Sequence, residues 1–206
     1  MQSIAPFVNN WLVTKVFGTL RQVPPDATET KRRILAAARQ EFAEFGLAGA
    51  RIDRIADQAQ ANKRSIYMHF GPKEHLFDLV VSSALAAMAE AVPFDSGDLA
   101  DYAVRLFDYV HEHPDTLRLT TWANLERPGA TAAEIATYRA KTDALDSRYA
   151  DRSADVLTLV LGLVTAWASA SPALVGLQAH RSPSVDARRA MLSDAVGAVV
   201  RAFGEE

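Results

Sequence analysis

The segment from residue 46 to residue 77 constrains the fold of this chain more than any other stretch. Its apolar residues recur at helical spacing over 52–59 and again at Ile66 and Phe70, which predicts two short helices in succession. Asn62 is a favourable N-cap for the second helix, and Gly71-Pro72 ends it because proline cannot continue a helix. Two short helices joined by a tight turn form a helix-turn-helix, whose second helix presents its first residues to the DNA major groove.

The polar side chains of this segment suit contact with DNA. Lys63 and Arg64 can donate to guanine O6 and N7, and Arg51 stands just ahead of the first short helix. Hydroxyl, imidazole and ammonium donors of the kind that bind phosphates follow at Ser65, Tyr67, His69 and Lys73. A buried helical hairpin with two solvated cations is the alternative interpretation, but it does not explain why the cap, the basic pair and the helix stop fall in register.

The run 65–77, SIYMHFGPKEHLF, resembles the signature of the TetR family of bacterial transcriptional regulators. The apolar residues of 34–38 with Phe42, Phe45-Gly46 and Ile55-Ala56 fall where that family has its first two helices, so the resemblance covers residues 28–80. It implies an all-α fold of about nine helices: an N-terminal three-helix helix-turn-helix DNA-binding domain, then a C-terminal helical ligand-binding and dimerisation domain.

Three residues depart from the family pattern. Ala50 stands where members usually carry Thr or Ser, so a hydroxyl that could cap a helix or contact a phosphate is missing. Gln60 stands where the turn between the two helices usually has Gly, and a positive φ would strain it. Arg64 replaces a small residue and would project toward the groove, which predicts an unusual base preference.

Charge divides the chain into an N-terminal extension (1–25), the DNA-binding domain (26–80) and the ligand-binding and dimerisation domain (81–206). Residues 26–80 carry nine Lys and Arg against eight Asp and Glu, a net charge of +1, whereas 81–206 carry eleven against seventeen, a net charge of −6. The acidic part would be repelled by DNA, which suits a domain held away from it. The chain has no Cys, which excludes disulfides and thiol catalysis and fits a reducing cytoplasm.

The extension has apolar residues at helical spacing and ends at Pro24-Pro25. It has no basic region ahead of a continuous apolar run, so it does not resemble a signal peptide. Packing on its own protein or on a dimer mate, or poor order, is favoured over contact with a membrane surface, because Lys15 and Arg21 are few cations for that role.

Six longer helices are expected from the apolar periodicity: 28–45, 73–91, 98–113, 114–125, 131–149 and 184–203. Residues 156–179 contain no charged side chain, but Pro172 leaves only 156–171 as the helical part, too short for the ~20 apolar residues of a membrane span. A helix apolar all round is buried, here in part by another subunit. The last two long helices (about 152–171 and 184–203) resemble the pair that forms the four-helix dimer interface of the TetR family.

No catalytic, cofactor or metal-binding pattern is found. His111 and His113 point to different sides of a helix, and there is neither a phosphate-binding glycine loop nor a nucleophile elbow. By resemblance, a pocket for a small apolar or amphipathic effector would lie in the C-terminal domain. Its candidate lining residues, each of which could equally be plain core, are Met88, Tyr102, Phe107, Trp122, Asn124, Tyr138 and Trp167.

The sequence therefore predicts a homodimeric, ligand-responsive DNA-binding regulator, a repressor of a palindromic operator rather than an enzyme or a membrane protein. Two other classes stay open: a ligand-independent DNA-binding protein with weak sequence preference, and a helical metabolite-binding protein that ignores DNA.

Overall fold

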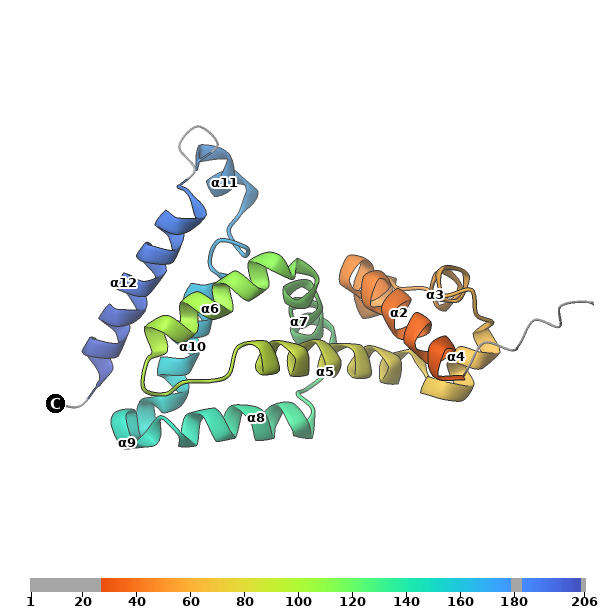
Figure 1. Ribbon diagram of the computed structural model, residues 1–206, viewed down its shortest axis with the longest axis horizontal. Helices are drawn as coiled ribbons and strands as arrows, with labels where there is room; N and C mark the ends of the chain where they lie inside the picture. Colours follow the sequence, from red (N-terminus) through yellow and green to blue (C-terminus); the bar gives the residue numbers. More distant parts are fainter. Residues whose placement is uncertain (1–26, 179–182, 205–206) are drawn as a thin grey trace, which may run out of the picture.

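The computed structural model describes residues 27–178 and 183–204, so the expectations for residues 1–25 lie outside the described residues. The described part of the chain is all-α, as predicted, and extends along one axis with its first helices at one end and its last helix at the other (Figure 1). In chain order the helices that build most of the described structure are α2 (Ala27–Gly49), α3 (Ile52–Gln58), α4 (Lys63–Phe70), α5 (Lys73–Ala91), α6 (Leu99–Glu112), α7 (Pro114–Glu126), α8 (Ala132–Asp143), α10 (Ser153–Thr165) and α12 (Val185–Phe203).

The first three helices and the start of α5 form a small domain that we call the head. Its core consists of apolar side chains at helical spacing, and Ile34, Phe42, Ile55, Ile66 and Phe77 are fully buried. The rings of Phe42 and Phe77 meet edge to face with centroids 5.1 Å apart, which joins α2 to α5.

Helix α5 connects the head to the remaining helices, which we call the body (Figure 1). Its first turns bury Leu76, Phe77 and Val80 in the core of the head, and Val92 directly after it belongs to the core of the body. The predicted bounds, 73–91, agree with those observed. Helix α6 packs on α12 and α10, with Leu106 and Phe107 buried between them.

The helix predicted over 131–149 is wrong as a single element, because α8 ends at Asp143 and a short helix, α9 (Asp146–Tyr149), follows at a different angle (Figure 1). Helix α8 buries none of its residues, whereas Leu145 and Tyr149 are 1% and 0% exposed. The chain turns after Asp143, and the two side chains that follow enter the core of the body. A 3₁₀ turn, Ala150–Arg152, then leads into α10.

The helix predicted over 156–171 is also too long, because α10 ends at Thr165 and residues 166–171 are not helical. A further short helix, α11 (Pro172–Gln178), begins at the proline, which is tolerated in a first helical turn but keeps the preceding residue out of helical conformation. Within the described residues, no helix combines the length and the hydropathy that a membrane span requires.

Candidate nucleic-acid interface and effector cavity

The start of α4 is fixed by a side-chain cap and by two buried anchors. The Asn62 side chain accepts a hydrogen bond from the Ser65 N–H at 2.7 Å, as the sequence predicts. Ile66 and Phe70 hold one face of the helix in the core. The opposite face presents Arg64 together with Tyr67, which is 51% exposed. A short helix with a rigid start and a polar, exposed face has the geometry required to enter a groove.

The other predicted DNA contacts occupy different environments. Lys63 is exposed but forms an ion pair with Asp53 in the first turn of α3, so contact with DNA would require it to change partner. Arg51 is exposed at the N-cap position of α3. Ser65 and His69 are half-buried, the latter with its ring 6.3 Å from that of Phe70.

Lys73 lies at the start of α5 and points to the loop between α2 and α3. Its ammonium donates to the carbonyls of Ala50 at 3.2 Å and Ala48 at 3.5 Å. The predicted phosphate contact stays a prediction, and the structure adds a second role, which is to hold that loop against α5.

The departures at residues 50 and 60 have visible local consequences. Ala50 is buried, and the N–H of Arg51 donates instead to the buried Glu41 carboxylate at 2.7 Å. Arg54 also pairs with Glu41, so one carboxylate from α2 anchors the start of α3 without a hydroxyl cap. Gln60 has a φ of +49°. This left-handed conformation is the one expected for a turn position that usually holds Gly.

Helix α7 belongs to the body but forms hydrogen bonds with the C-terminal part of α2. Arg118 donates to the carbonyls of Ala43 at 2.7 Å and Glu44 at 3.2 Å, and the Glu126 carboxylate accepts the N–H groups of Leu47 and Ala48. These groups lie on either side of a kink in α2, so α7 satisfies carbonyls that end one helical segment and N–H groups that begin the next.

The kink is made by Gly46, whose φ is +69° and ψ is −174°. A Cβ at this position would lie 2.8 Å from ring atoms of Trp122 and from a Glu126 oxygen, both on α7. Only glycine combines that conformation with such a close approach. The helix predicted over 28–45 therefore ends at this kink, and the absence of a side chain at Gly46 lets α7 pack against α2.

A second contact between head and body lies at the other end of α7. Arg39 on α2 forms an ion pair with Asp115 and donates to the Thr116 hydroxyl at 2.9 Å. Burial raises the pKa of the Asp115 carboxyl, but the adjacent Arg39 outweighs this and keeps that pKa below its ordinary value.

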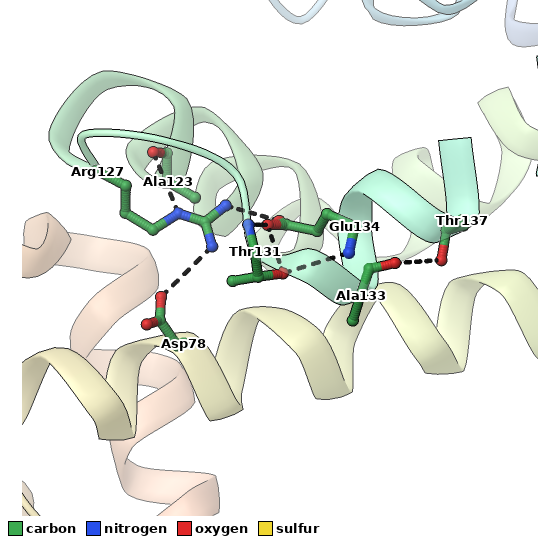
Figure 2. A network of polar contacts seen from close by, with 7 residues as sticks. All are labelled: Asp78, Ala123, Arg127, Thr131, Ala133, Glu134 and Thr137. Atoms are coloured by element: carbon green, nitrogen blue, oxygen red, sulfur yellow. Dashed lines mark hydrogen bonds and ion pairs between the residues drawn. The ribbon is translucent and has the colours of Figure 1, made fainter. Parts of the chain in front are cut away.

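Arg127, directly after α7, joins three elements at once (Figure 2). Its guanidinium lies 2.6 Å from the Glu134 carboxylate on α8 and 3.4 Å from Asp78 on α5. Glu134 also closes a capping box with Thr131 at the start of α8. Burial raises the pKa of Glu134, but Arg127 and the Thr131 N–H and hydroxyl together lower it below its ordinary value.

Two adjoining cavities open between helices of the body. The first, of 710 Å³, lies between α6, α7, the end of α10 and α12, and the second, of 500 Å³, between α5, α6, α7, α8 and α10. Five residues line both cavities: Val110, Leu117, Thr121, Val164 and Ser169. Volumes of this size are typical of small-molecule sites.

Six of the seven residues predicted for effector binding line these two cavities. Phe107, Trp122 and Trp167 line the first, and Met88, Asn124 and Tyr138 line the second. Tyr102 lines neither of these two cavities, because it is a core residue, 1% exposed, with its ring packed against Phe94 at 5.0 Å and its hydroxyl bonded to Lys141. The effector site itself stays a prediction.

Sequence reasoning missed several side chains at both places. Met68 is 68% exposed beside Arg64 on α4. Because residues 64 and 68 are four apart on a predicted helix, the sequence could have placed them on the same face. Arg118 and Arg188 line the first cavity, but they are far apart in sequence and no local pattern connects them. No cluster of His, Asp or Glu among the described residues has the arrangement of a metal site.

Comparison with known proteins connects both parts of the chain to one family. Residues 34–80 match the family model described as bacterial regulatory proteins, tetR family, and residues 98–197 match the model described as tetracyclin repressor-like, C-terminal domain. The Streptomyces coelicolor protein SCO4942 has a similar crystal structure, with a TM-score of 0.73 and 38% identity over 82% of this chain and 97% of that chain.

Two curated relatives share part of the sequence. The HTH-type transcriptional repressor SCO4008 of Streptomyces coelicolor is 46% identical over 49% of this chain and 53% of its own length. The HTH-type transcriptional repressor NicS of Pseudomonas putida is 35% identical over 49% of this chain and 51% of its own length. The chain thus spans about half the length of the curated relatives it matches.

Proposed function

The chain belongs to the TetR family of bacterial transcriptional regulators, and from that premise we propose that it is a repressor that binds a palindromic operator as a homodimer and is released by a small-molecule effector. The family consists of regulators rather than enzymes. The observation that carries the proposal is the start of α4, where a capped and anchored helix exposes an arginine and its neighbours on one face.

Within the head, we assign Arg64 to base edges and the surrounding residues to positioning. Arg64 is exposed on the outer face, whereas Lys63 pairs with Asp53 and Lys73 with backbone carbonyls. Met68, beside it, offers a thioether that suits the methyl group of thymine. Arg51, Ser65, Tyr67 and His69 supply donors for phosphates around this centre.

The proposed dimer forms through α10 and α12. Leu159 on α10 and Met191 on α12 are 43% and 54% exposed, which leaves apolar surface for a second subunit. The outward faces of both helices are otherwise rich in small residues that allow close helix packing, namely Ala154, Gly162, Ala187, Ala190 and Ala198. A two-fold dimer would set the two α4 helices in successive major grooves, about 34–36 Å apart.

Helix α7 is the proposed connection between effector and operator. Trp122 and Arg118 line the first cavity, and the same two residues contact α2 around Gly46. An effector that binds better when α7 is displaced would favour an orientation of the head that fits the operator less well. The size of this shift is set by the difference between the affinities of the effector for the two conformations.

The test is selection of bound sequences from a random duplex pool with the full-length protein at near-physiological salt. We expect an enriched palindrome, with half-sites about one helical turn apart. An Arg64→Ala variant should lose the enriched bases, and Arg139→Ala, an exposed arginine on α8, should retain them.

Two other outcomes would support the other classes. Binding that depends on salt but enriches no sequence would identify a DNA-binding protein with weak sequence preference. The absence of DNA binding would favour a metabolite-binding protein and overturn the proposed repressor.

A further inference from the structure

The first cavity contains positive charge without negative charge. Among the described residues that line it, Arg118 and Arg188 are cationic, and no carboxylate is present. The adjoining second cavity has no charged lining residue. Charges of one sign in a cleft with apolar walls create a local potential that attracts the opposite charge, here an anion.

Arg188 also has an unused donor at this place. Its Nε is buried, and nothing in the described part of the chain accepts a hydrogen bond from it. Arg189, the next residue on α12, is engaged by two carboxylates by comparison, because its Nε donates to Asp108 at 2.7 Å and its Nη1 pairs with Asp186. Within the described residues Arg188 forms no ion pair, so, unlike Arg189, its guanidinium is available to an anion in the cavity.

The walls around Arg188 are aromatic. The Arg188 Cζ atom stands 5.9 Å from the ring centroid of Trp167, which meets Phe107 edge to face at 5.6 Å, and Trp122 lines the same cavity from α7. Aromatic walls favour a flat apolar body, and a guanidinium favours an acid group.

We propose that the effector is an organic anion, a flat apolar body with a carboxylate or sulfonate that accepts hydrogen bonds from Arg188. The word effector rests on the proposed function, whereas the choice of an anion rests on the cavity alone. The bound acid also lies in the cavity lined by Arg118, whose Nε holds the Ala43 carbonyl of α2 at 2.7 Å. An anion that draws Arg118 toward itself therefore weakens a contact between body and head.

The experiment compares three probes that share one ring system and differ in charge: 2-naphthoate, 2-naphthamide and 2-naphthylmethylamine. Two of the three tryptophans, Trp122 and Trp167, line the cavity, so quenching of tryptophan fluorescence in the full-length protein without DNA reports binding. We expect naphthoate to bind about tenfold more tightly than the amide, and the amine to bind most weakly.

Variants at residue 188 locate the acid group. Arg188→Gln should remove the tenfold preference for naphthoate over the amide, Arg188→Lys should keep part of it, and Arg139→Gln, an exposed arginine on α8, should leave it unchanged. Thermal denaturation of each variant verifies that the body stays folded. A preference that survives Arg188→Gln contradicts the assignment.

The proposal is overturned if the amide or the amine binds as well as naphthoate, or if naphthoate does not bind at millimolar concentration. Operator release is measured separately. Naphthoate that binds through Arg188 but leaves operator affinity unchanged contradicts the effector role and preserves the anion site. Release by an uncharged or cationic compound preserves the effector role and contradicts the anion.

Discussion

The head and the body close their apolar cores to different degrees. In the head, the large apolar residues of α2, α3, α4 and α5 are mostly buried, and two of the exposed ones, Tyr67 and Met68 on α4, lie on the proposed DNA-reading face. In the body, cavities remain, among them the two described above, and large apolar side chains are exposed on several helices, including Leu125, Ile135, Leu159, Leu174 and Met191. The head thus buries its apolar side chains within one chain. The body leaves apolar surface that, in our proposal, a second subunit and an effector cover.

The largest expected effect tests the point where the two regions meet. Gly46→Ala should lower the free energy of unfolding by about 3–5 kcal/mol, because it adds a strained backbone conformation to a clash with Trp122. Urea denaturation followed by circular dichroism measures it. Gly129→Ala is the control, since a Cβ there meets nothing within 4 Å. Equal stability of the two variants would show that head and body do not depend on this contact.

The next effect concerns Arg127, whose side chain and that of Glu134 are only 9% and 11% exposed. Glu134→Gln should cost about 2–3 kcal/mol, because it leaves a mostly buried guanidinium without its main partner. The same denaturation assay measures it, with Glu29→Gln as control. Glu29 pairs with Arg32 on the open surface of α2, so that variant should unfold like the unmodified protein. A similar loss in both variants would contradict the buried role of Glu134.

The same pair gives the body a dependence on pH. The pKa of Glu134 is lowered in the folded protein, so its contribution is complete above the pKa of an unfolded glutamate, about 4.3. The contribution is lost as pH falls through the lower pKa of the folded state. The difference in stability between the unmodified protein and Glu134→Gln should therefore be constant from pH 7 to pH 5 and shrink in more acidic buffer, as urea titrations at each pH would show.

A third effect compares two cations within the head. Arg64→Ala should cost about 1–3 kcal/mol at the cognate operator and relax the base preference, whereas Lys73→Ala should weaken binding to all sequences nearly equally. Electrophoretic titration of the operator and of a scrambled duplex over several salt concentrations measures both. If Lys73 contacts a phosphate, its variant lowers the salt slope; if it only holds the loop at Ala50, the slope stays unchanged.

These differences explain what the sequence could predict. The head was predictable because its signals are local: Asn62 caps Ser65 three residues on, and Ile66 and Phe70 lie four residues apart on one face. The break between α8 and α9 was not, because the periodicity of 131–149 continues while Leu145 and Tyr149 turn into a core formed by distant helices. Arg118 and Arg188 share a cavity only after α7 and α12 have packed, so no spacing in the sequence relates them.

The smallest effect tests the one local departure that the sequence predicts to be strained. Gln60→Gly should stabilise the protein by about 0.5–1 kcal/mol, because relief of a left-handed conformation, worth about 1–2 kcal/mol, exceeds the extra entropy of glycine in the unfolded chain. Gln58→Gly, at the last residue of α3, should instead destabilise by about 1 kcal/mol, since glycine weakens a helix and the substitution also removes the hydrogen bond from the Gln58 amide to Gln40. Thermal denaturation of both variants gives the signs. Opposite signs would show that the backbone at Gln60 is strained, whereas destabilisation by both substitutions would show that the turn is not strained at this residue.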